Sequence, residues 1–399
     1  MLPPTVIPLE METGNRQKAV PPPHKSDRPE PELHTPMKTN PSLLRHLAVA
    51  AALLLPAATP TLFAQTTATT DPVGFITLTA AGGGTVASPK LTLLSPTLMQ
   101  PISWQGAITG VSTNTTGSTT ITVSGVQWTT DQFNGAAGAY YLEIISTTTP
   151  AHSGVMGQIT STTAGTTNSS LTTTENLFTF AAIGDTIRIR KDLTLADVFG
   201  ATNSAGLLAS SGDASTADEI LLYNGAASVS YFYYTGSPGF PAGWYNSTTF
   251  DPAGTVVLAP HQGVVIKKKT TGGVTFTSNG AVKTGNTLFP VVNGLNVLGT
   301  VSAQGLTLAT SGLYTGDANT GVKPSSGDAS TADELVLYPS GSPVSYFYYT
   351  GSPGFPAGWY NSTTFDPADA VSIAPGTAFV LNRKGGVAFN WTLPSPSSF

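Results

Sequence analysis

The stretch Val229–Ala253 reads VSYFYYTGSPGFPAGWYNSTTFDPA, and it recurs without change as Val344–Ala368. A shorter block, GDASTADE, precedes each copy, at Gly212–Glu219 and at Gly327–Glu334, with the same offset of 115 residues. An offset of this size implies a repeating unit as large as a small domain and longer than the units of solenoids or propellers. The sequence therefore predicts two tandem, similar domains.

Each copy is expected to consist mainly of short strands. In the first copy the apolar and β-branched runs predict strands at Ile220–Tyr223, Val229–Thr235, Val264–Lys268 and Val274–Thr277. Asn224-Gly225 predicts a hairpin turn, and because the next predicted strand begins only at Val229, we expect a loop longer than two residues. A short helix should begin after Thr194 as N-cap and end at Gly200.

The part of the chain before the repeats differs in sequence. Ile121–Val123, Tyr141–Ile145 and Thr186–Ile189 alternate apolar and polar residues, which is the pattern of half-buried strands. Thr- and Gly-rich stretches separate them, as in small barrels and sandwiches. The predicted fold class is all-β: a small N-terminal β-barrel or sandwich domain at 65–190, then β-rich repeats at 191–290 and 291–399.

The composition supports folded β-structure. Charged residues make up 10% of the chain, against about 25% in an ordinary globular domain. Disordered chains are poor in aromatic residues, whereas this one has 13 Tyr, 17 Phe and 5 Trp. The chain has no cysteine, which excludes disulfides, thiolate metal sites and cysteine nucleophiles.

Residues 37–64 have the layout of a secretory signal peptide. Lys38 and Arg45 form a basic region, the apolar run 47–55 follows, and Ala64 can precede a cleavage site that leaves Gln65 as the mature start. The apolar run is shorter than the about 20 residues that span a bilayer. We expect an exported protein, extracellular or associated with the cell envelope, with no transmembrane span in the mature chain.

Residues 1–36 are Pro-rich and polar, and they precede this signal. We expect a disordered extension or a start assigned too early, with Met37 as the true start; an extended cytoplasmic n-region is the alternative. Residues 1–64 carry six Lys/Arg and five Asp/Glu, so the mature chain keeps eleven basic and seventeen acidic residues, a net charge of −6. This charge does not favour nucleic acid. The one basic run, Lys267–Lys269, is expected to end a strand in solvent.

Three short motifs support a family resemblance. They are Asp71–Phe75 (DPVGF) after the signal, Gly184–Arg190 (GDTIRIR) running into Leu193–Leu195, and Ala217–Glu219 before an apolar strand. On these motifs most of the mature chain resembles an uncharacterised family of exported, paralogous proteins of similar length in verrucomicrobial-type bacteria. The resemblance implies export and a β-rich architecture, and it implies no catalytic residue.

The residues that carry most enzyme chemistry are sparse. The mature chain keeps two histidines, His152 and His261, which we interpret as surface loop residues, and it has no Gly-x-Ser-x-Gly motif. Paired carboxylates perform glycoside hydrolysis, and the candidates here are Asp218, Glu219, Asp251, Asp333, Glu334 and Asp366. Their Ser-, Gly- and Pro-rich surroundings favour turn caps instead. Asp317–Gly321 matches only the start of a calcium loop. We expect no catalytic residue, metal or cofactor.

The aromatic block gives the candidate binding residues. These are Tyr231, Tyr233, Trp244 and Tyr245 in the first copy and Tyr346, Tyr348, Trp359 and Tyr360 in the second. The block either forms the core or presents one face as a platform that stacks on sugar rings or on a partner protein. The platform hypothesis predicts that both tryptophans lie at equivalent places, partly exposed, beside the Gly/Pro-rich loop 236–243 and its copy.

Three functions remain open. The first is an exported, non-enzymatic structural or adhesive protein of the cell envelope or extracellular space. The second is a pair of glycan-binding modules, which would gain avidity from their tandem arrangement. The third is a carbohydrate-active enzyme. The expected partners are a polysaccharide or another envelope protein.

Overall fold

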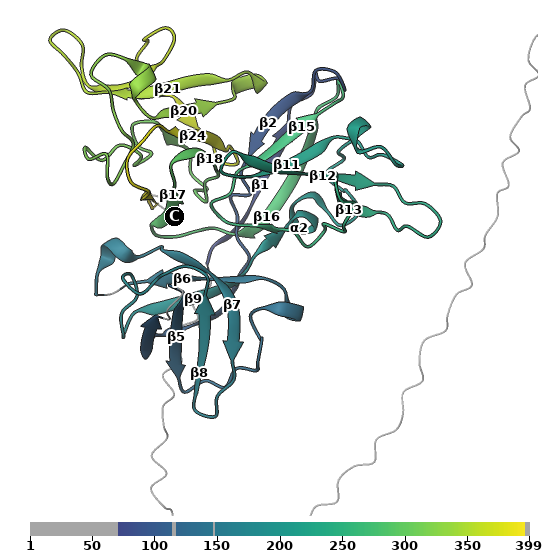
Figure 1. Ribbon diagram of the computed structural model, residues 1–399, viewed down its shortest axis with the longest axis vertical. Coiled ribbons are helices and arrows are strands. Elements are labelled where there is room, and N and C mark those ends of the chain that lie inside the picture. Colours follow the sequence, from purple (N-terminus) through teal and green to yellow (C-terminus); the bar gives the residue numbers. More distant parts are fainter. Residues whose placement is uncertain (1–70, 114–116, 147, 396–399) are drawn as a thin grey trace, which may run out of the picture. The chain divides into compact units, whose positions relative to one another are not determined.

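A computed structural model describes residues 71–113, 117–146 and 148–395, and within them the chain is all-β (Figure 1). Seven sheets account for the strands of this part, every ladder between neighbouring strands is antiparallel, and the single α-helix, α2, is five residues long. The prediction that the chain is all-β is confirmed. The predicted extension 1–36 and signal peptide 37–64 lie outside the described residues. No helix of the described part is long and apolar enough to cross a membrane.

A seven-stranded sheet with the order β3-β9-β6-β7-β8-β5-β4 occupies the middle of the N-terminal region. Its strands are β3 (Ile102–Ala107), β4 (Gly110–Thr113), β5 (Thr119–Ser124), β6 (Tyr140–Ile145), β7 (Met156–Thr163), β8 (Asn168–Thr173) and β9 (Thr186–Lys191). Two 3₁₀ turns, η1 (Gly135–Ala137) and η2 (Pro150–His152), lie in its connections.

This sheet closes on itself. β3 and β4 lie at opposite ends of the strand order, yet only Ile108 and Thr109 separate them along the chain. Across this kink Ile108 N donates to Asp185 O (2.7 Å) on one side, and Thr109 N donates to Thr122 O (2.9 Å) on the other. One bent strand therefore joins both edges, and of the two architectures predicted from the sequence the structure has the small barrel.

The two repeats share one topology. The first has a five-stranded sheet, β13-β12-β11-β15-β2, and two ribbons, β10-β14 and β1-β16. Its elements are β1 (Val73–Ala80), β2 (Lys90–Leu94), β10 (Leu193–Thr194), α2 (Leu195–Phe199), η3 (Ala214–Thr216), β11 (Glu219–Asn224), β12 (Ala227–Tyr234), β13 (Gly243–Asn246), β14 (Val257–Leu258), β15 (Val264–Lys268) and β16 (Val274–Ala281).

The second repeat has the sheet β22-β21-β20-β24-β18 and the ribbons β19-β23 and β17-β25, in the same connectivity. Its elements are β17 (Thr287–Val291), β18 (Gly294–Leu298), β19 (Leu306–Thr307), η4 (Ala329–Thr331), β20 (Glu334–Leu337), η5 (Pro339–Gly341), β21 (Val344–Tyr349), β22 (Gly358–Asn361), β23 (Ser372–Ile373), β24 (Phe379–Arg383) and β25 (Phe389–Leu393). Sheet for sheet, β1 and β2 correspond to β17 and β18.

This correspondence departs from the predicted domain boundaries. β1 and β2 fall within the predicted domain 65–190, but they pair with β16 and β15 of the first repeat. The barrel is thus an insertion between β2 and β10, where the second repeat has only the short connection between β18 and β19. The alternation of apolar and polar residues identifies a strand but not its partner, so the sequence pattern alone did not reveal the insertion.

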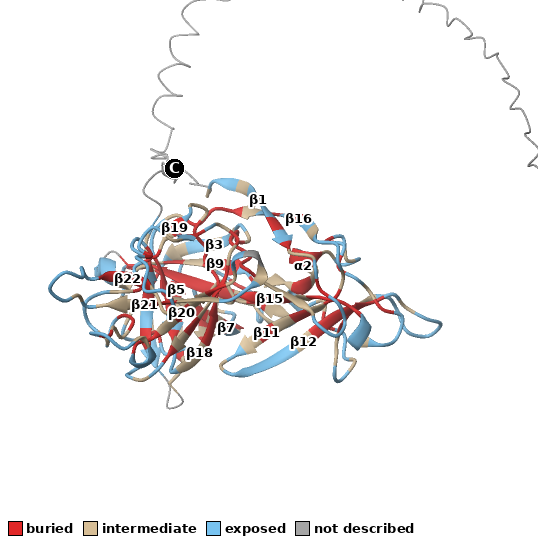
Figure 2. Cartoon of the chain, turned by 90° about the horizontal axis from the view of Figure 1, so that it is seen from above, coloured by how far each residue is buried: buried red, intermediate tan, exposed pale blue. Residues whose placement is uncertain are grey.

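Of the predictions of local structure, some are confirmed and others are wrong. The helix is as expected: Thr194 and Asp197 form a reciprocal capping box at its start, and Gly200 ends it. The prediction of a long hairpin loop after Asn224 is wrong, because Asn224 pairs with Ala227 and leaves only a two-residue turn. β12 starts earlier than its apolar residues suggest, since exposed Ala227 and Ser228 continue the ladder. Figure 2 shows burial concentrated on the strands and exposure on the loops.

Candidate functional site

Trp244 and Trp359, the proposed binding anchors, are buried. Each is 2% exposed, so the predicted partial exposure of both rings is wrong. Trp244 belongs to the same core cluster as Tyr231 and Tyr233, and its indole Nε1 donates to Gly200 O at 2.8 Å. The helix and its C-cap therefore cover the ring, and the platform hypothesis loses these two residues.

Tyr245, the residue after Trp244 in β13, is covered on the other face of the sheet. Tyr245 is 3% exposed and joins Phe232 and Tyr234 in a small second cluster against residues of η3. Of the other candidates, Tyr360 and Tyr346 are also buried, and Tyr348 is half-buried. Tyr348 stacks on Tyr314, with ring centroids 3.4 Å apart. None of the eight candidate side chains is openly exposed.

The predicted equivalence of the two copies is correct. In the first repeat Tyr233 lies opposite Trp244 in the ladder between β12 and β13. In the second, Tyr348 lies opposite Trp359 in the ladder between β21 and β22. The repeated sequence thus forms the same hairpin twice.

The phenylalanines of the loop are exposed aromatic residues of the block. Phe240 is 43% exposed and Phe355 is 56% exposed. Each ends a Ser-Pro-Gly-Phe turn, Ser237–Phe240 or Ser352–Phe355, and we call these two segments the Phe turns. Neither phenylalanine is among the binding residues predicted from the sequence, although the Gly/Pro-rich loop that carries each of them is predicted. Pro followed by Gly in the middle of a four-residue turn was the signal that identifies them.

The backbone of each Phe turn is fixed by hydrogen bonds. Ser237 N donates to Phe240 O and Phe240 N donates to Ser237 O, both at 2.9 Å, and the corresponding bonds in the second copy are 2.8 and 2.9 Å. Gly239 has φ +83° and Gly354 has φ +87°, as position i+2 of a type II turn requires. Proline at the preceding position fixes φ there. The exposed rings therefore stand on rigid turns.

Buried tyrosines support both turns from below. The Tyr245 hydroxyl donates to Pro241 O (2.9 Å), and the Tyr360 hydroxyl donates to Pro356 O (3.0 Å). The Phe240 ring lies 5.4 Å from that of Tyr245 and 5.9 Å from that of Tyr234, centroid to centroid. In the first repeat the buried tyrosines thus also contact the exposed Phe240 ring.

A second phenylalanine in each copy has an unusual backbone. Phe250 and Phe365 have φ of +59° and +56°, a left-handed conformation that is rare for a bulky residue. The Asn246 side chain stabilises the preceding turn by accepting from Thr248 N (2.8 Å) and Thr249 N (3.1 Å), and Asn361 does the same in the second copy. Phe365 is 44% exposed, so this repeat presents two exposed aromatic rings.

Two of the candidate carboxylates are in buried ion pairs. Asp218 pairs with Lys268, and Asp333 pairs with Arg383 (2.7 Å), at the same offset as the sequence repeat. Lys268 is 2% exposed and Lys269 is 6% exposed, so the prediction of a solvated lysine run is wrong for these two residues. In β15 it alternates with Lys267 and points to the core side, where Asp218 neutralises it.

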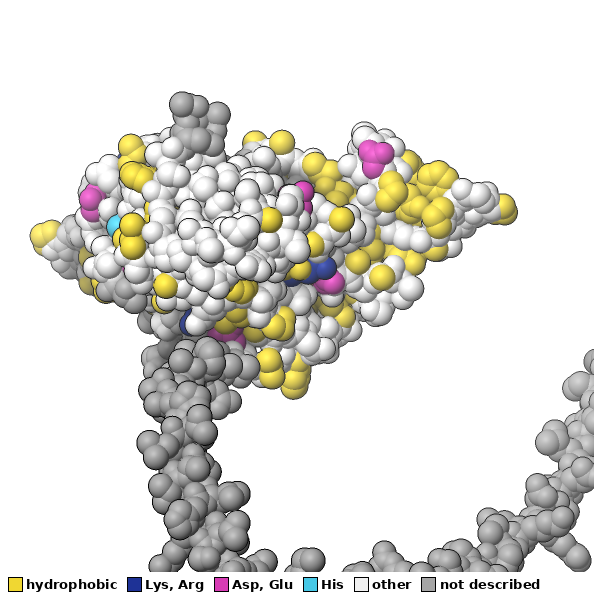
Figure 3. All heavy atoms as spheres, turned by 90° about the horizontal axis from the view of Figure 1, so that it is seen from below, with side chains coloured by type: hydrophobic (Ala, Val, Ile, Leu, Met, Phe, Trp, Pro, Cys, Tyr) yellow, Lys and Arg dark blue, Asp and Glu magenta, His cyan; other side chains and the backbone are white. Residues whose placement is uncertain are grey.

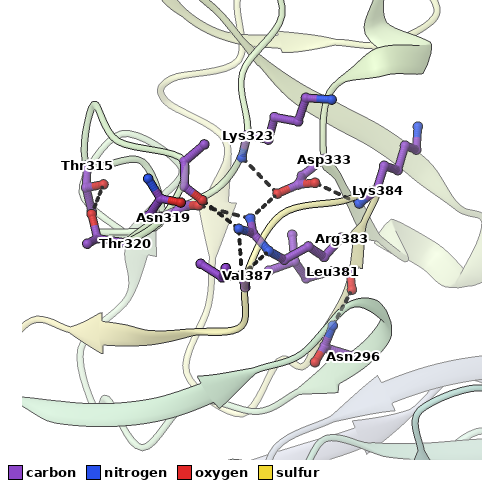
Figure 4. A network of polar contacts seen from close by, with 12 residues as sticks. Asn296, Thr315, Asn319, Thr320, Lys323, Asp333, Leu381, Arg383, Lys384 and Val387 are labelled. Carbon is purple, nitrogen blue, oxygen red and sulfur yellow. Dashed lines mark hydrogen bonds and ion pairs between the residues drawn. The ribbon is translucent and has the colours of Figure 1, made fainter.

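The second of these ion pairs is part of a wider network (Figure 4). Asp333 also accepts the backbone N–H of Lys323 and of Lys384, each at 2.8 Å. Arg383 additionally donates to backbone oxygens of three residues in neighbouring loops, Ala318, Gly321 and Val387. Both carboxylate oxygens of Asp333 are thus occupied by structural partners, which extends the predicted capping role.

The remaining titratable candidates have local roles. Asp317 Oδ1 accepts from the backbone and side-chain nitrogens of Asn319 (2.8 and 2.9 Å). Asp366 Oδ2 accepts from Thr364 Oγ1 (2.7 Å). His152 packs edge-on against Phe180, and burial lowers the pKa of His261 to about 4. Among the described residues no group of three or more Asp, Glu or His could hold a metal ion.

Comparisons with known proteins match no family model, no curated protein and no solved structure.

Proposed function

We propose that this chain is an exported, non-enzymatic structural or adhesive protein of the cell envelope or extracellular space, and that the two Phe turns are its contact points. One observation carries the proposal: both repeats hold an exposed phenylalanine at the same place on the same rigid turn. Packing in a core tolerates hydrophobic swaps of similar volume. A loop tolerates change more readily unless backbone angles or a ligand constrain it.

A rigid exposed ring suits adhesion. Full burial of a phenylalanine side chain contributes about 2 to 3 kcal/mol, and each turn still exposes about half of its ring. Because backbone hydrogen bonds and the supporting tyrosines already order the turn, binding loses little conformational entropy. Two turns on one chain also add avidity when the partner surface repeats.

The chemistry of the surface indicates an uncharged partner. Only 10% of all residues are charged, and Figure 3 shows a face on which charged side chains are few and scattered. Thr235, Ser237 and Thr350 are exposed in and beside the turns. Such a surface fits a polysaccharide or another envelope protein, and binding should depend weakly on salt.

Glycan binding is the second candidate, with a changed site. The buried tryptophans cannot stack on a sugar, whereas Phe240 and Phe355 can, with hydroxyl side chains at their rim. A carbohydrate-active enzyme would need acids such as Asp218 and Asp333, whose carboxylates are paired with Lys268 and Arg383.

Fractionation of producing cells tests the proposed compartment. The protein should be found in the envelope or medium with Gln65, or a residue close to it, as its first residue. Recovery from the cytosol with residues 37–64 uncleaved would contradict export. Purified protein should show no cleavage of envelope polysaccharides. Cleavage that is lost in an Asp218→Asn, Asp333→Asn double variant which still folds would replace the proposal by the enzymatic one.

A further inference from the structure

The two repeats are joined by backbone hydrogen bonds between their five-stranded sheets. Gly263 N, just before β15, donates to Val297 O of β18 (3.0 Å), and Gly299 N donates to His261 O (2.9 Å). A side chain adds to these bonds: Ser95 Oγ, just after β2, accepts from Thr300 N and donates to Thr300 O, both at 2.8 Å. The join is therefore built like a sheet edge, and it holds the outer faces of the two sheets together.

A cavity of about 230 Å³ lies at this join. Its walls are mainly aliphatic, with Leu91 and Leu93 from β2, Val265 from β15, and Leu295, Val336 and Val380 from the second repeat. Tyr223 and Tyr338 also line the cavity, and Glu334 and Asn382 contribute a carboxylate and an amide to it. A carboxylate beside aliphatic walls is the combination that binds an apolar cation.

In the first repeat the residue equivalent to Glu334 is Glu219, and two lysines lie beside its carboxylate. Glu219 lies opposite Lys267 in the ladder, and its carboxylate pairs with Lys267 (3.0 Å) and Lys269 (3.3 Å). Its side chain is 12% exposed. The first repeat thus surrounds this glutamate with two ammonium groups.

The second repeat lacks one of these two ammonium groups. Glu334 lies opposite Asn382, and among the described residues its carboxylate pairs with Lys384, at the longer distance of 3.4 Å. The side chain of Glu334 is 28% exposed, more than twice the value for Glu219. A carboxylate with reduced neutralisation therefore lines the cavity.

We propose that this cavity binds a compact apolar molecule with a single positive charge, such as an alkyl- or arylalkylammonium. Its ammonium group lies beside Glu334, at the position that Lys267 occupies beside Glu219. The apolar body fills the space between Leu93, Val336 and Val380, where each Å² removed from water contributes about 25 cal/mol. The side-chain oxygen of Asn382 accepts a hydrogen bond from the ammonium. This site is independent of the Phe turns.

Isothermal titration of the full mature chain tests the proposal with three matched probes: hexylammonium, 1-hexanol and hexanoate. Hexylammonium should saturate one site and bind at least about fivefold more tightly than hexanol, which corresponds to about 1 kcal/mol for a half-exposed ion pair. Hexanoate should not bind. Methyl NMR signals of Val336 and Val380 should shift with hexylammonium. Equal affinity for hexanol, no binding of hexylammonium, or shifts elsewhere overturns the proposal.

Asn382→Lys is the decisive variant, because it gives the second repeat the ion pair that the first repeat already has. It should fold and should weaken hexylammonium binding at least about fivefold. Glu334→Gln should remove the preference of hexylammonium over hexanol. Lys267→Asn, a change of the same kind outside the cavity lining, is the control and should leave the affinity unchanged. Tight hexylammonium binding by folded Asn382→Lys contradicts the proposed site.

Discussion

Arg383→Lys replaces the buried cation of the second repeat with the one used by the first. Lysine can keep the ion pair with Asp333, as Lys268 does with Asp218. It cannot reproduce the planar guanidinium, which donates in several directions at once. The variant therefore separates the contribution of the ion pair from that of the additional hydrogen bonds.

The expected loss follows from those bonds. The guanidinium donates to the backbone oxygens of Ala318 (2.5 Å), Gly321 (3.1 Å) and Val387 (2.8 and 3.0 Å). Three carbonyl groups at about 1 kcal/mol each give about 3 kcal/mol. The stacking of Arg383 over Phe389, 4.7 Å from the ring centroid, adds up to about 1 kcal/mol. We expect the free energy of unfolding of this repeat to fall by about 3 to 4 kcal/mol.

Unfolding in guanidinium chloride, followed by tryptophan fluorescence, gives the global free energy of unfolding, since Trp359 and Trp391 lie in the core of this repeat. Hydrogen exchange at the amides of Lys323 and Lys384 gives the local value, because both donate to Asp333. As the control, Lys384→Met breaks only a surface ion pair and should cost less than about 1 kcal/mol. If Arg383→Lys is as stable as the wild type and its amides stay protected, the network does not stabilise the repeat.

Two further predictions concern a turn and a buried acid. Gly239→Ala and Gly354→Ala should each lower the free energy of unfolding by about 1 kcal/mol in a thermal unfolding assay, because both glycines have positive φ although an added Cβ would meet no neighbour. Gly212→Ala is the control: its added Cβ also meets no neighbour and its φ is not positive, so it should leave the stability unchanged. Burial raises the pKa of Asp192 from 3.8 to about 6, so the folded state stays protonated while the unfolded state ionises, and stability falls as pH rises through this window. Asp192→Asn should therefore match the wild type near pH 3.5 and be more stable by about 3 kcal/mol at pH 7 in urea unfolding; an equal difference at both pH values refutes the assignment.

The sequence predicted those features of the fold that depend on neighbouring residues. The capping box at Thr194, the strands at Ile220 and Val264, and the equivalence of the two hairpins all follow from local pattern or from repetition. Alternation of apolar and polar residues also predicted β5, whose burial alternates along the strand, but it left open whether these strands form a barrel or a sandwich.

Strand partners and the covering of faces could not be predicted in the same way. β13 is an edge strand with only four residues, so its alternation could not show that α2 covers Trp244 while η3 and Phe250 cover the side of Tyr245. The platform hypothesis failed on this point. The prediction that the lysine run lies in solvent failed for a similar reason: the charge of the side chains suggested exposure, whereas the alternation of the strand directs Lys268 inward.

The start of the first repeat was hidden by the inserted barrel. Leu91–Leu94 reads LTLL and Leu295–Leu298 reads LNVL, and these two segments form the equivalent strands β2 and β18. Their similarity is too short to notice, and the barrel separates β2 from the rest of its repeat. Only the pairing with β15 shows where β2 belongs.

The proposal that the Phe turns are the adhesive contacts is tested most directly by binding to envelopes isolated from the producing cells. Wild type, Phe240→Ser, Phe355→Ser and the double variant are compared by co-sedimentation, with Val387→Ser, an equally exposed apolar residue elsewhere, as control. Because about half of each ring is free to be buried, a lost ring contact of about 1 to 1.5 kcal/mol predicts about 5- to 12-fold weaker binding for each single variant. The double variant should bind about 30- to 150-fold more weakly, and the control should bind like the wild type. Wild-type binding by the folded double variant would contradict the account.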